Sequence, residues 1–379
     1  MLKKISAVAF LIAATMSAPL AAPNIIDLPD SLWAGDSVTW VRKVPFYCEG
    51  PAYDETTGHV YFTQQIGNST PNWPVWRVKP GVDTGIVWYN TYQNNGLEFD
   101  YQGRLIAAQN GRLSRLTGPS PVTKGSGSGG SPDTATIVAS GNNGVTFGQA
   151  NDLSIGKKGD IFFTTLGSSI YYMNPLKVLY TATNTGATIS GANGIEWLSS
   201  DTSSLYVNAN SSNKVYKYTI GANGSLSNRT DFVASIPGPD GGTYDSHGNR
   251  YVASYSRGEI RVYSAKGDSI GRIALRVQSG IYDSVTSSGR VGNNGNADNC
   301  VFGGTDLKTL YITGDGGLFS IPLKIRGVAR AEPPNALRPS VSKLDQDNKA
   351  TEPRDVRGRL LAPETKVPAV RVPIRETGR

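Results

Sequence analysis

A single unit repeats six times along this chain of 379 residues. Each copy begins with an oxygen-bearing side chain, continues through a small residue and an apolar alternation, turns, and ends in a strand of aromatic and β-branched residues. The clearest copy runs from Cys48-Glu49-Gly50-Pro51-Ala52-Tyr53-Asp54 to Gly58-His59-Val60-Tyr61-Phe62-Thr63. The copies begin at Glu49, Asn95, Asn151, Asn193, Asp240 and Asn299, and subtracting successive positions gives spacings of 46, 56, 42, 47 and 59 residues. This period is typical of propeller blades, so the sequence predicts an all-β, six-bladed β-propeller.

The first 22 residues have the pattern of a secretory signal peptide. Lys3 and Lys4 precede an apolar run from Ile5 to Met16, and small residues follow it at Ala21 and Ala22. The apolar run is too short to span a bilayer as a helix. We therefore expect a secreted protein, periplasmic if the source is bacterial, without stable membrane insertion.

The remaining chain divides into three parts. We place a lead-in segment at residues 23–47, the propeller at residues 48–327, and a Pro-rich, basic, disordered tail at residues 328–379. The formal charge of +7 comes from the ends, because the signal peptide holds two lysines and residues 324–379 hold 13 basic against 7 acidic side chains. The 22 basic and 23 acidic side chains between them argue against a nucleic-acid partner. We expect a monomer.

The residues that open the six units predict a metal site in the central channel. The innermost strand of each propeller blade lines that channel, so equivalent opening residues would form one ring of side-chain oxygens. Carboxylate and amide oxygens suit Ca²⁺, with Mg²⁺, Mn²⁺ or Zn²⁺ as alternatives. Turn chemistry is the competing explanation, because Asn, Asp and Gly favour turns. It does not account for Glu49, and we therefore favour the metal.

The chain has few residues from which other catalytic arrangements could be built. The two histidines, His59 and His247, each lie beside a glycine in a predicted turn, which disfavours a Ser-His-Asp triad or a histidine zinc site. The two cysteines, Cys48 and Cys300, open neighbouring blades once the ring is closed. They either form a disulfide that closes the ring or remain two buried thiols.

The ordered set of motifs resembles the senescence marker protein, gluconolactonase and luciferin-regenerating-enzyme-like family of six-bladed propellers. The motifs that carry the resemblance are Glu49-Gly50-Pro51, Asn95-Gly96-Leu97, Asn151-Asp152-Leu153, Asn193-Gly194-Ile195, Pro239-Asp240-Gly241 and Asn299-Cys300-Val301-Phe302-Gly303-Gly304. The resemblance implies one divalent ion held by Glu49, Asn151, Asn193 and Asp240. The chain departs from the family where a proline commonly precedes the ligand asparagines, because Ala150 and Ala192 stand there. It also has Gln149 in place of an arginine, and Gln109-Asn110-Gly111 in place of Glu-His-Gly.

The function implied by the resemblance is metal-dependent hydrolysis of a sugar lactone or related lactone. Asp240, or Glu49, would accept a proton from the attacking water while the ion polarises the carbonyl. Asn95, Asn110 and Gln149 are the residues expected to bind substrate. The alternatives are hydrolysis of other esters or phosphotriesters at the same site, or a non-catalytic, calcium-stabilised binding propeller of the cell envelope.

Overall fold

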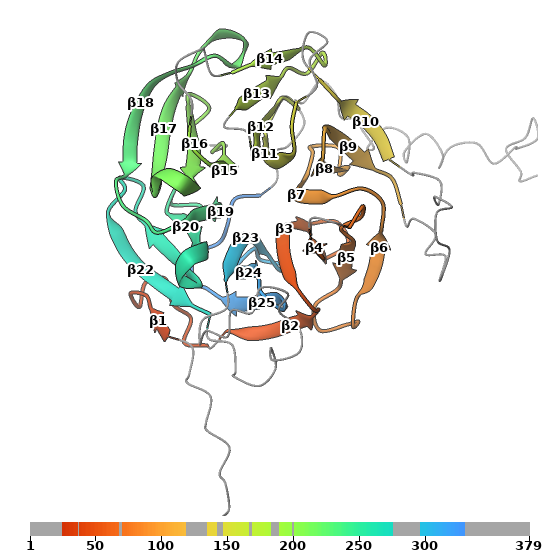
Figure 1. Ribbon diagram of the computed structural model, residues 1–379. Coiled ribbons are helices and arrows are strands. Elements are labelled where there is room, and N and C mark those ends of the chain that lie inside the picture. The colour runs from red at the N-terminus through yellow and green to blue at the C-terminus, as the bar shows by residue number, and fades with distance from the viewer. Residues whose placement is uncertain are drawn as a thin grey trace, which may run out of the picture. The chain divides into compact units, whose positions relative to one another are not determined.

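The computed structural model describes residues 25–36, 38–67, 70–118, 135–141, 147–166, 169–182, 189–198, 201–275 and 296–329. It shows six antiparallel sheets arranged in a ring (Figure 1). The predicted six-bladed β-propeller is confirmed. The expected signal peptide and the tail from residue 330 onward lie outside the described residues. In the part that the structure describes, no helix is both long enough and apolar enough to cross a membrane.

Each blade is a sheet whose strands follow one another from the channel outward. Blade one consists of β3 (Tyr47–Asp54), β4 (His59–Gln65), β5 (Val75–Val78) and β6 (Ile86–Tyr89). Blade two consists of β7 (Asn94–Phe99), β8 (Leu105–Gln109), β9 (Arg112–Leu116) and β10 (Ala135–Ala139). Blade three consists of β11 (Ala150–Ile155), β12 (Ile161–Thr165), β13 (Ile170–Met173) and β14 (Leu179–Thr181). Blade four consists of β15 (Ala192–Glu196), β16 (Ser204–Ala209), β17 (Lys214–Ile220) and β18 (Leu226–Val233). Blade five starts with β19 (Pro239–Tyr244), β20 (Arg250–Ser254), β21 (Glu259–Tyr263) and β22 (Ser269–Ala274), and blade six with β23 (Ala297–Gly303), β24 (Thr309–Gly314) and β25 (Gly317–Pro322). Three short 3₁₀ turns, η1 (Asn210–Ser212), η2 (Ala222–Gly224) and η3 (Tyr255–Arg257), lie between strands.

The ring is closed by the N-terminal segment. Strand β2 (Thr39–Lys43) pairs antiparallel with β25 and completes blade six, while β1 (Ile25–Asp27) pairs with β22 at the edge of blade five (Figure 1). Trp40 packs on Phe319 with the ring centroids 4.0 Å apart. The predicted propeller boundary at residue 48 is therefore too late, because part of the lead-in is a strand of the last blade.

Aromatic side chains join neighbouring blades at a repeated position. In four blades, an aromatic residue of the second strand packs against an aromatic residue at or within one position of the end of the next blade's inner strand. The ring pairs are Tyr61–Phe99, Phe162–Trp197, Tyr251–Phe302 and Tyr311–Tyr53, with centroids 5.4, 5.1, 5.1 and 6.1 Å apart. Such pairs bury large apolar surfaces between sheets, and they fix the order of the blades around the channel.

The two cysteines are free. Cys48 and Cys300 are both buried and unpaired with one another, so the ring-closing disulfide left open by the sequence is not formed. Burial raises the pKa of both thiols. They contribute to the hydrophobic cores of the first and last blades.

Candidate functional site

A β-bulge near the start of every inner strand sets the positions of the ring residues. The register of the ladder shifts between Glu49 and Ala52, Asn94 and Leu97, Ala150 and Leu153, Ala192 and Ile195, Pro239 and Gly242, and Ala297 and Asn299. A bulge places one extra residue in a strand and re-aims the side chains beside it. The bulges therefore give the six inner strands one common geometry at one end of the channel.

The register corrects the sixth member of the predicted ring. After the bulge, Gly242 pairs with Val252 in blade five, and Cys300 pairs with Ile312 in blade six. The residue two positions earlier is Asp240 in blade five and Asp298 in blade six. The prediction that Asn299 belongs to the ring is therefore wrong by one residue, because Asn299 occupies the position that is glycine in four other blades. The later aromatic residue, Phe302 matching Tyr244, was the sequence signal that could have set this alignment.

The glycine that follows most ring residues serves close approach between blades. A side chain at Gly50 would overlap the carbonyl oxygen of Asn95, and one at Gly241 would overlap the amide of Asn299. Gly50 has a positive φ of 50°, but Gly241 does not. Packing between neighbouring inner strands, rather than turn conformation, therefore accounts for the repeated glycine.

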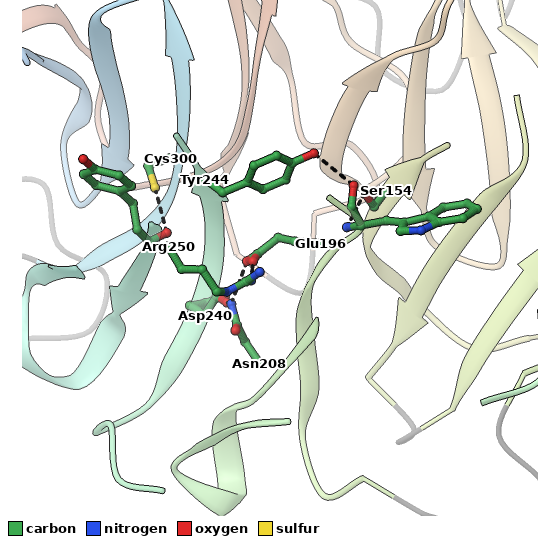
Figure 2. A network of polar contacts seen from close by, with 9 residues as sticks. Ser154, Glu196, Asn208, Asp240, Tyr244, Arg250 and Cys300 are labelled. Atoms are coloured by element: carbon green, nitrogen blue, oxygen red, sulfur yellow. Dashed lines mark hydrogen bonds and ion pairs between the residues drawn. The ribbon is translucent and has the colours of Figure 1, made fainter. Parts of the chain in front are cut away.

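The backbone of the ring is held by side chains from the preceding blade. The Thr63 hydroxyl donates to the carbonyl oxygen of Asn95 (2.9 Å), and the Thr164 hydroxyl donates to that of Asn193 (2.6 Å). In blade four the equivalent residue is Asn208, whose Nδ2 donates to the carbonyl oxygen of Asp240 (2.5 Å; Figure 2). These bonds satisfy buried carbonyl groups and hold the ring residues in place.

Glu49 is a buried carboxylate near the start of β3. Its side chain is 3% exposed and accepts hydrogen bonds from Gly50 N at Oε2 (3.1 Å) and from the Tyr47 hydroxyl at Oε1 (3.5 Å). Burial, followed by the charge of Asp152, raises the pKa of Glu49 to about 8. Hydrogen bonds from Gly50, Asn299 and Tyr47 oppose that increase. The site therefore favours the neutral form of Glu49 in the absence of a positive partner.

Asp240 is also buried, with 3% of its surface exposed, and its Oδ1 atom has no hydrogen-bond partner in the part of the chain that the structure describes. Burial and the charges of Glu49 and Asp152 raise the pKa of Asp240 well above its ordinary value. The side chain of Asn193 and the Gly241 N–H act in the opposite direction. Glu49 and Asn193 are therefore both close enough to Asp240 to act on its carboxyl group.

The donors at this end of the channel fit a hard cation. Asn151 is buried at the equivalent position of blade three, so the ring combines carboxylate and amide oxygens of the kind that Ca²⁺ prefers. Among the described residues, no three His, Cys, Asp or Glu side chains are grouped to hold a metal by themselves. A cation here would therefore need amide oxygens beside the carboxylates. The unpartnered Oδ1 of Asp240 and the mutual repulsion of the acids are the observations that match such an ion.

The channel contains a cavity on the far side of the ring. Asn299 Nδ2 donates to Asp152 Oδ2 (3.2 Å), and this bond links the opposite blades six and three. Farther along the inner strands lies a cavity of about 170 Å³, lined by all six blades and including Glu98, Asp152, Glu196, Trp197 and Tyr244. This cavity therefore does not coincide with the ring. We place the chemistry at the ring, because the unpartnered carboxylate oxygen lies there.

A buried ion pair, which the sequence did not indicate, supports the ring from outside. Arg250 is 1% exposed, pairs with Glu196, and stacks 4.1 Å above the centroid of Tyr206. Glu196 Oε1 accepts a hydrogen bond from Asn208 Nδ2 (3.2 Å), the same amide that holds the Asp240 carbonyl (Figure 2). Burial lowers the pKa of Arg250 to about 9. The chain of contacts runs from Arg250 through Glu196 and Asn208 to the backbone of Asp240.

The predicted substrate-binding residues lie in two places. Asn95 is a buried ring residue, whereas Asn110 is exposed and forms an isolated β-bridge with Gln149 beyond the start of the inner strands. Asn110 Nδ2 donates to Gln93 Oε1 (3.1 Å). Gln109 is fully buried and bonded to Asn94 (2.7 Å), so its side chain is used inside blade two.

The histidines remain outside the ring. His59 Nδ1 lies 2.8 Å from the Thr57 hydroxyl at the turn after β3, and His247 lies in the turn after β19. Both turns are at the far ends of their inner strands. No histidine accompanies Glu49 and Asp240 in the described part of the chain.

The comparisons with known proteins agree with this architecture. Residues 47–315 match the SMP-30/gluconolactonase/LRE-like region. The chain is similar to the lactonase drp35 of Staphylococcus aureus, at 32% identity over 139 residues, and to that of Staphylococcus saprophyticus, at 31% over 121 residues. These alignments cover 33% and 30% of this chain, and only 41% and 36% of the relatives.

Similar solved structures extend over most of the chain at lower identity. The gluconolactonase of Xanthomonas campestris has a TM-score of 0.61 and 21% identity, covering 80% of this chain and 98% of its own. The calcium-binding protein regucalcin of Agrobacterium tumefaciens has a TM-score of 0.58 and 16% identity, covering 82% and 97%. These likenesses support the fold. Because the matched region covers more than half of the sequence, the chain belongs to the SMP-30/gluconolactonase/LRE-like family.

Proposed function

We propose that this protein is a lactone hydrolase whose active site is the ring of inner-strand residues around Glu49 and Asp240. The observation that carries the proposal is a pair of buried carboxylates that repel one another, one of which has an unpartnered oxygen. Such a pair is costly unless a positive charge joins it. Relatives named as lactonases support lactones as the substrate class.

One divalent cation completes the proposed site, and Ca²⁺ is the best match to its oxygen donors. Glu49, Asn151, Asn193 and Asp240 would hold it. A cation bound at this ring would polarise a substrate carbonyl and acidify a water molecule.

Asp240 is the proposed general base. Its free Oδ1 can accept the proton of the water that attacks the lactone carbonyl. The same carboxyl group can return that proton to the leaving oxygen of the lactone when the bond between this oxygen and the carbonyl carbon breaks. Asn193 steadies the carboxylate, while Asn208 holds the backbone of Asp240 through its carbonyl oxygen. Glu49 is the second acidic group and the reserve candidate for proton transfer.

Substrate recognition is proposed for Asn95, Asn110 and Gln149. Asn110 and Gln149 lie together beyond the ring, where they can donate hydrogen bonds to the hydroxyl groups of a sugar lactone. Because Gln109 is already bonded within blade two, it is left out of this set. Other esters, phosphotriesters, or a purely binding role at the cell envelope are the alternatives that the test must separate.

The test is turnover by the purified protein of a panel of sugar lactones, simple lactones, aryl esters and phosphotriesters, with and without chelator. We expect lactone opening that chelator abolishes and Ca²⁺ restores. Turnover of aryl esters or phosphotriesters alone would move the assignment to those substrates. A folded, cation-loaded protein that hydrolyses none of them would overturn the enzyme proposal.

We also propose that the protein is exported by residues 1–22. Cell fractionation followed by N-terminal sequencing would test this. A mature chain beginning after Ala21 or Ala22 supports export, and an intact N-terminus in the cytoplasm contradicts it.

A further inference from the structure

Asp298 is a buried carboxylate with no hydrogen-bond partner among the described residues. It is 0% exposed, and neither Oδ1 nor Oδ2 makes a hydrogen bond. An internal structural bond therefore does not explain the residue, and the fold alone would favour an apolar or bonded side chain here.

The position of Asp298 is that of a ring residue. Its place two residues before Cys300 in β23 matches the place of Asp240 before Gly242 in β19. Blade six lies between blades five and one, because β23 contacts both β19 and β3. Asp298 therefore lies between Asp240 and Glu49 in the order of the ring.

The charges around Asp298 are those of the proposed cation site. Burial, and then the charges of Glu49, Asp240 and Asp315, raise the pKa of Asp298. Burial, and then the charges of Asp298, Asp240 and Glu49, raise the pKa of the Tyr47 hydroxyl. Asp298 is thus close enough to Glu49 and Asp240 for their charges to act on it.

We propose that Asp298 is a third acidic group of the cation site, acting on the bound ion from just outside the direct ligands. The inference rests on the proposed cation at Glu49 and Asp240, and it adds a residue to that site. An outer position is chosen because three carboxylates do not converge on one point among the described residues. From there Asp298 attracts the ion by its charge and accepts a hydrogen bond from one of the ion's water molecules. This contact would satisfy an oxygen that the protein leaves unpartnered.

The test compares wild type with Asp298→Asn in two measurements that do not depend on turnover. Calorimetric titration with Ca²⁺ should show affinity reduced about 10- to 100-fold in the variant, as is usual for partners just outside the ligands. In thermal unfolding, the cation-free variant should melt at nearly the same temperature as cation-free wild type, because burial favours the neutral form of Asp298 and the amide is neutral too. The increase in melting temperature on adding Ca²⁺ should be smaller in the variant.

Asp245→Asn is the matched control, because Asp245 is equally buried but is bonded to the backbone N–H groups of His247 and Asn249 in a turn. It should lower the melting temperature with and without Ca²⁺ and leave Ca²⁺ affinity within about twofold of wild type. The new amide group replaces Oδ2, the acceptor of the Asn249 side chain and the Tyr251 hydroxyl, and these bonds are structural. Asp298→Ala also removes the carboxyl group, and it is the second variant to be tested if the amide of Asp298→Asn disturbs folding.

The outcomes separate this inference from the proposed function. If wild type binds Ca²⁺ and both Asp298 variants bind it equally well, Asp298 has no part in the site, while the proposed function stands. If wild type binds none of Ca²⁺, Mg²⁺, Mn²⁺ and Zn²⁺, the cation site itself is wrong, and this role is wrong with it. Equal destabilisation of both Asp298 variants in the presence and absence of cation would assign Asp298 to the fold alone.

Discussion

Asn299 and Asp152 are joined by a 3.2 Å hydrogen bond that crosses the channel from blade six to blade three. Asn299 also offsets part of the increase in the pKa of Glu49. Replacing Asn299 by Ala would leave an oxygen of Asp152 without its donor. We expect the free energy of unfolding to fall by about 1–3 kcal/mol, measured by chemical denaturation. An unchanged stability would show that the bond across the channel contributes nothing.

The close approach of Gly241 to Asn299 predicts a large effect from a single methyl group. Gly241→Ala would force a Cβ into the Asn299 amide, so we expect it to destabilise the protein by about 1–3 kcal/mol, the usual cost of overpacking. Gly148→Ala is the control, because a Cβ there meets no atom within 4 Å. Similar melting temperatures for the two variants would argue against packing as the reason for the glycine.

The two bonds made by Asn208 predict a kinetic effect at Asp240. Asn208→Ala removes the donor from the Asp240 carbonyl and from Glu196. We expect kcat for lactone opening to fall about 10- to 100-fold with a smaller change in KM, since the base is displaced while substrate contacts remain. Thr164→Val removes the equivalent bond to Asn193, which acts on the side chain of Asp240 but not on its backbone, so kcat should fall less than in Asn208→Ala. Equal losses in kcat would mean that Asn208 supports the ring only generally.

The raised pKa of Glu49 predicts how pH changes stability in the absence of cations. Because its pKa of about 8 lies above the ordinary value of 4.5, the folded protein binds this proton more tightly than the unfolded chain does. The resulting stabilisation is complete below about pH 4.5 and is lost as the pH rises to about 8, amounting to a few kcal/mol. Denaturation in chelator across this range would measure it. Glu49→Gln should flatten the dependence, and an unchanged slope would contradict the assignment.

The fold could be predicted from local patterns, since each blade repeats its own turn and strand signals. The presence of Glu49 and Asp240 at one end of the channel followed from that repeat. The identity of the sixth ring residue did not, because a bulge shifts the register by one residue and Asp298 and Asn299 both carry oxygen. Contacts between elements distant in sequence, such as β2 with β25 or Arg250 with Glu196, also leave no local pattern. The repeated glycines could be seen in the sequence, but the reason for them could not, because it is the close approach of the neighbouring blade.

We propose that Asp240 transfers the proton in a cation-dependent lactone hydrolysis. The most direct measurement is the rate of lactone opening by wild type and Asp240→Asn, with bound cation determined in both samples and its concentration raised to equal occupancy. We expect the variant to lose at least about 100-fold in kcat while cation-bound, because general-base catalysis contributes on that scale. Hydrolysis at the wild-type rate by the cation-loaded variant would contradict the account.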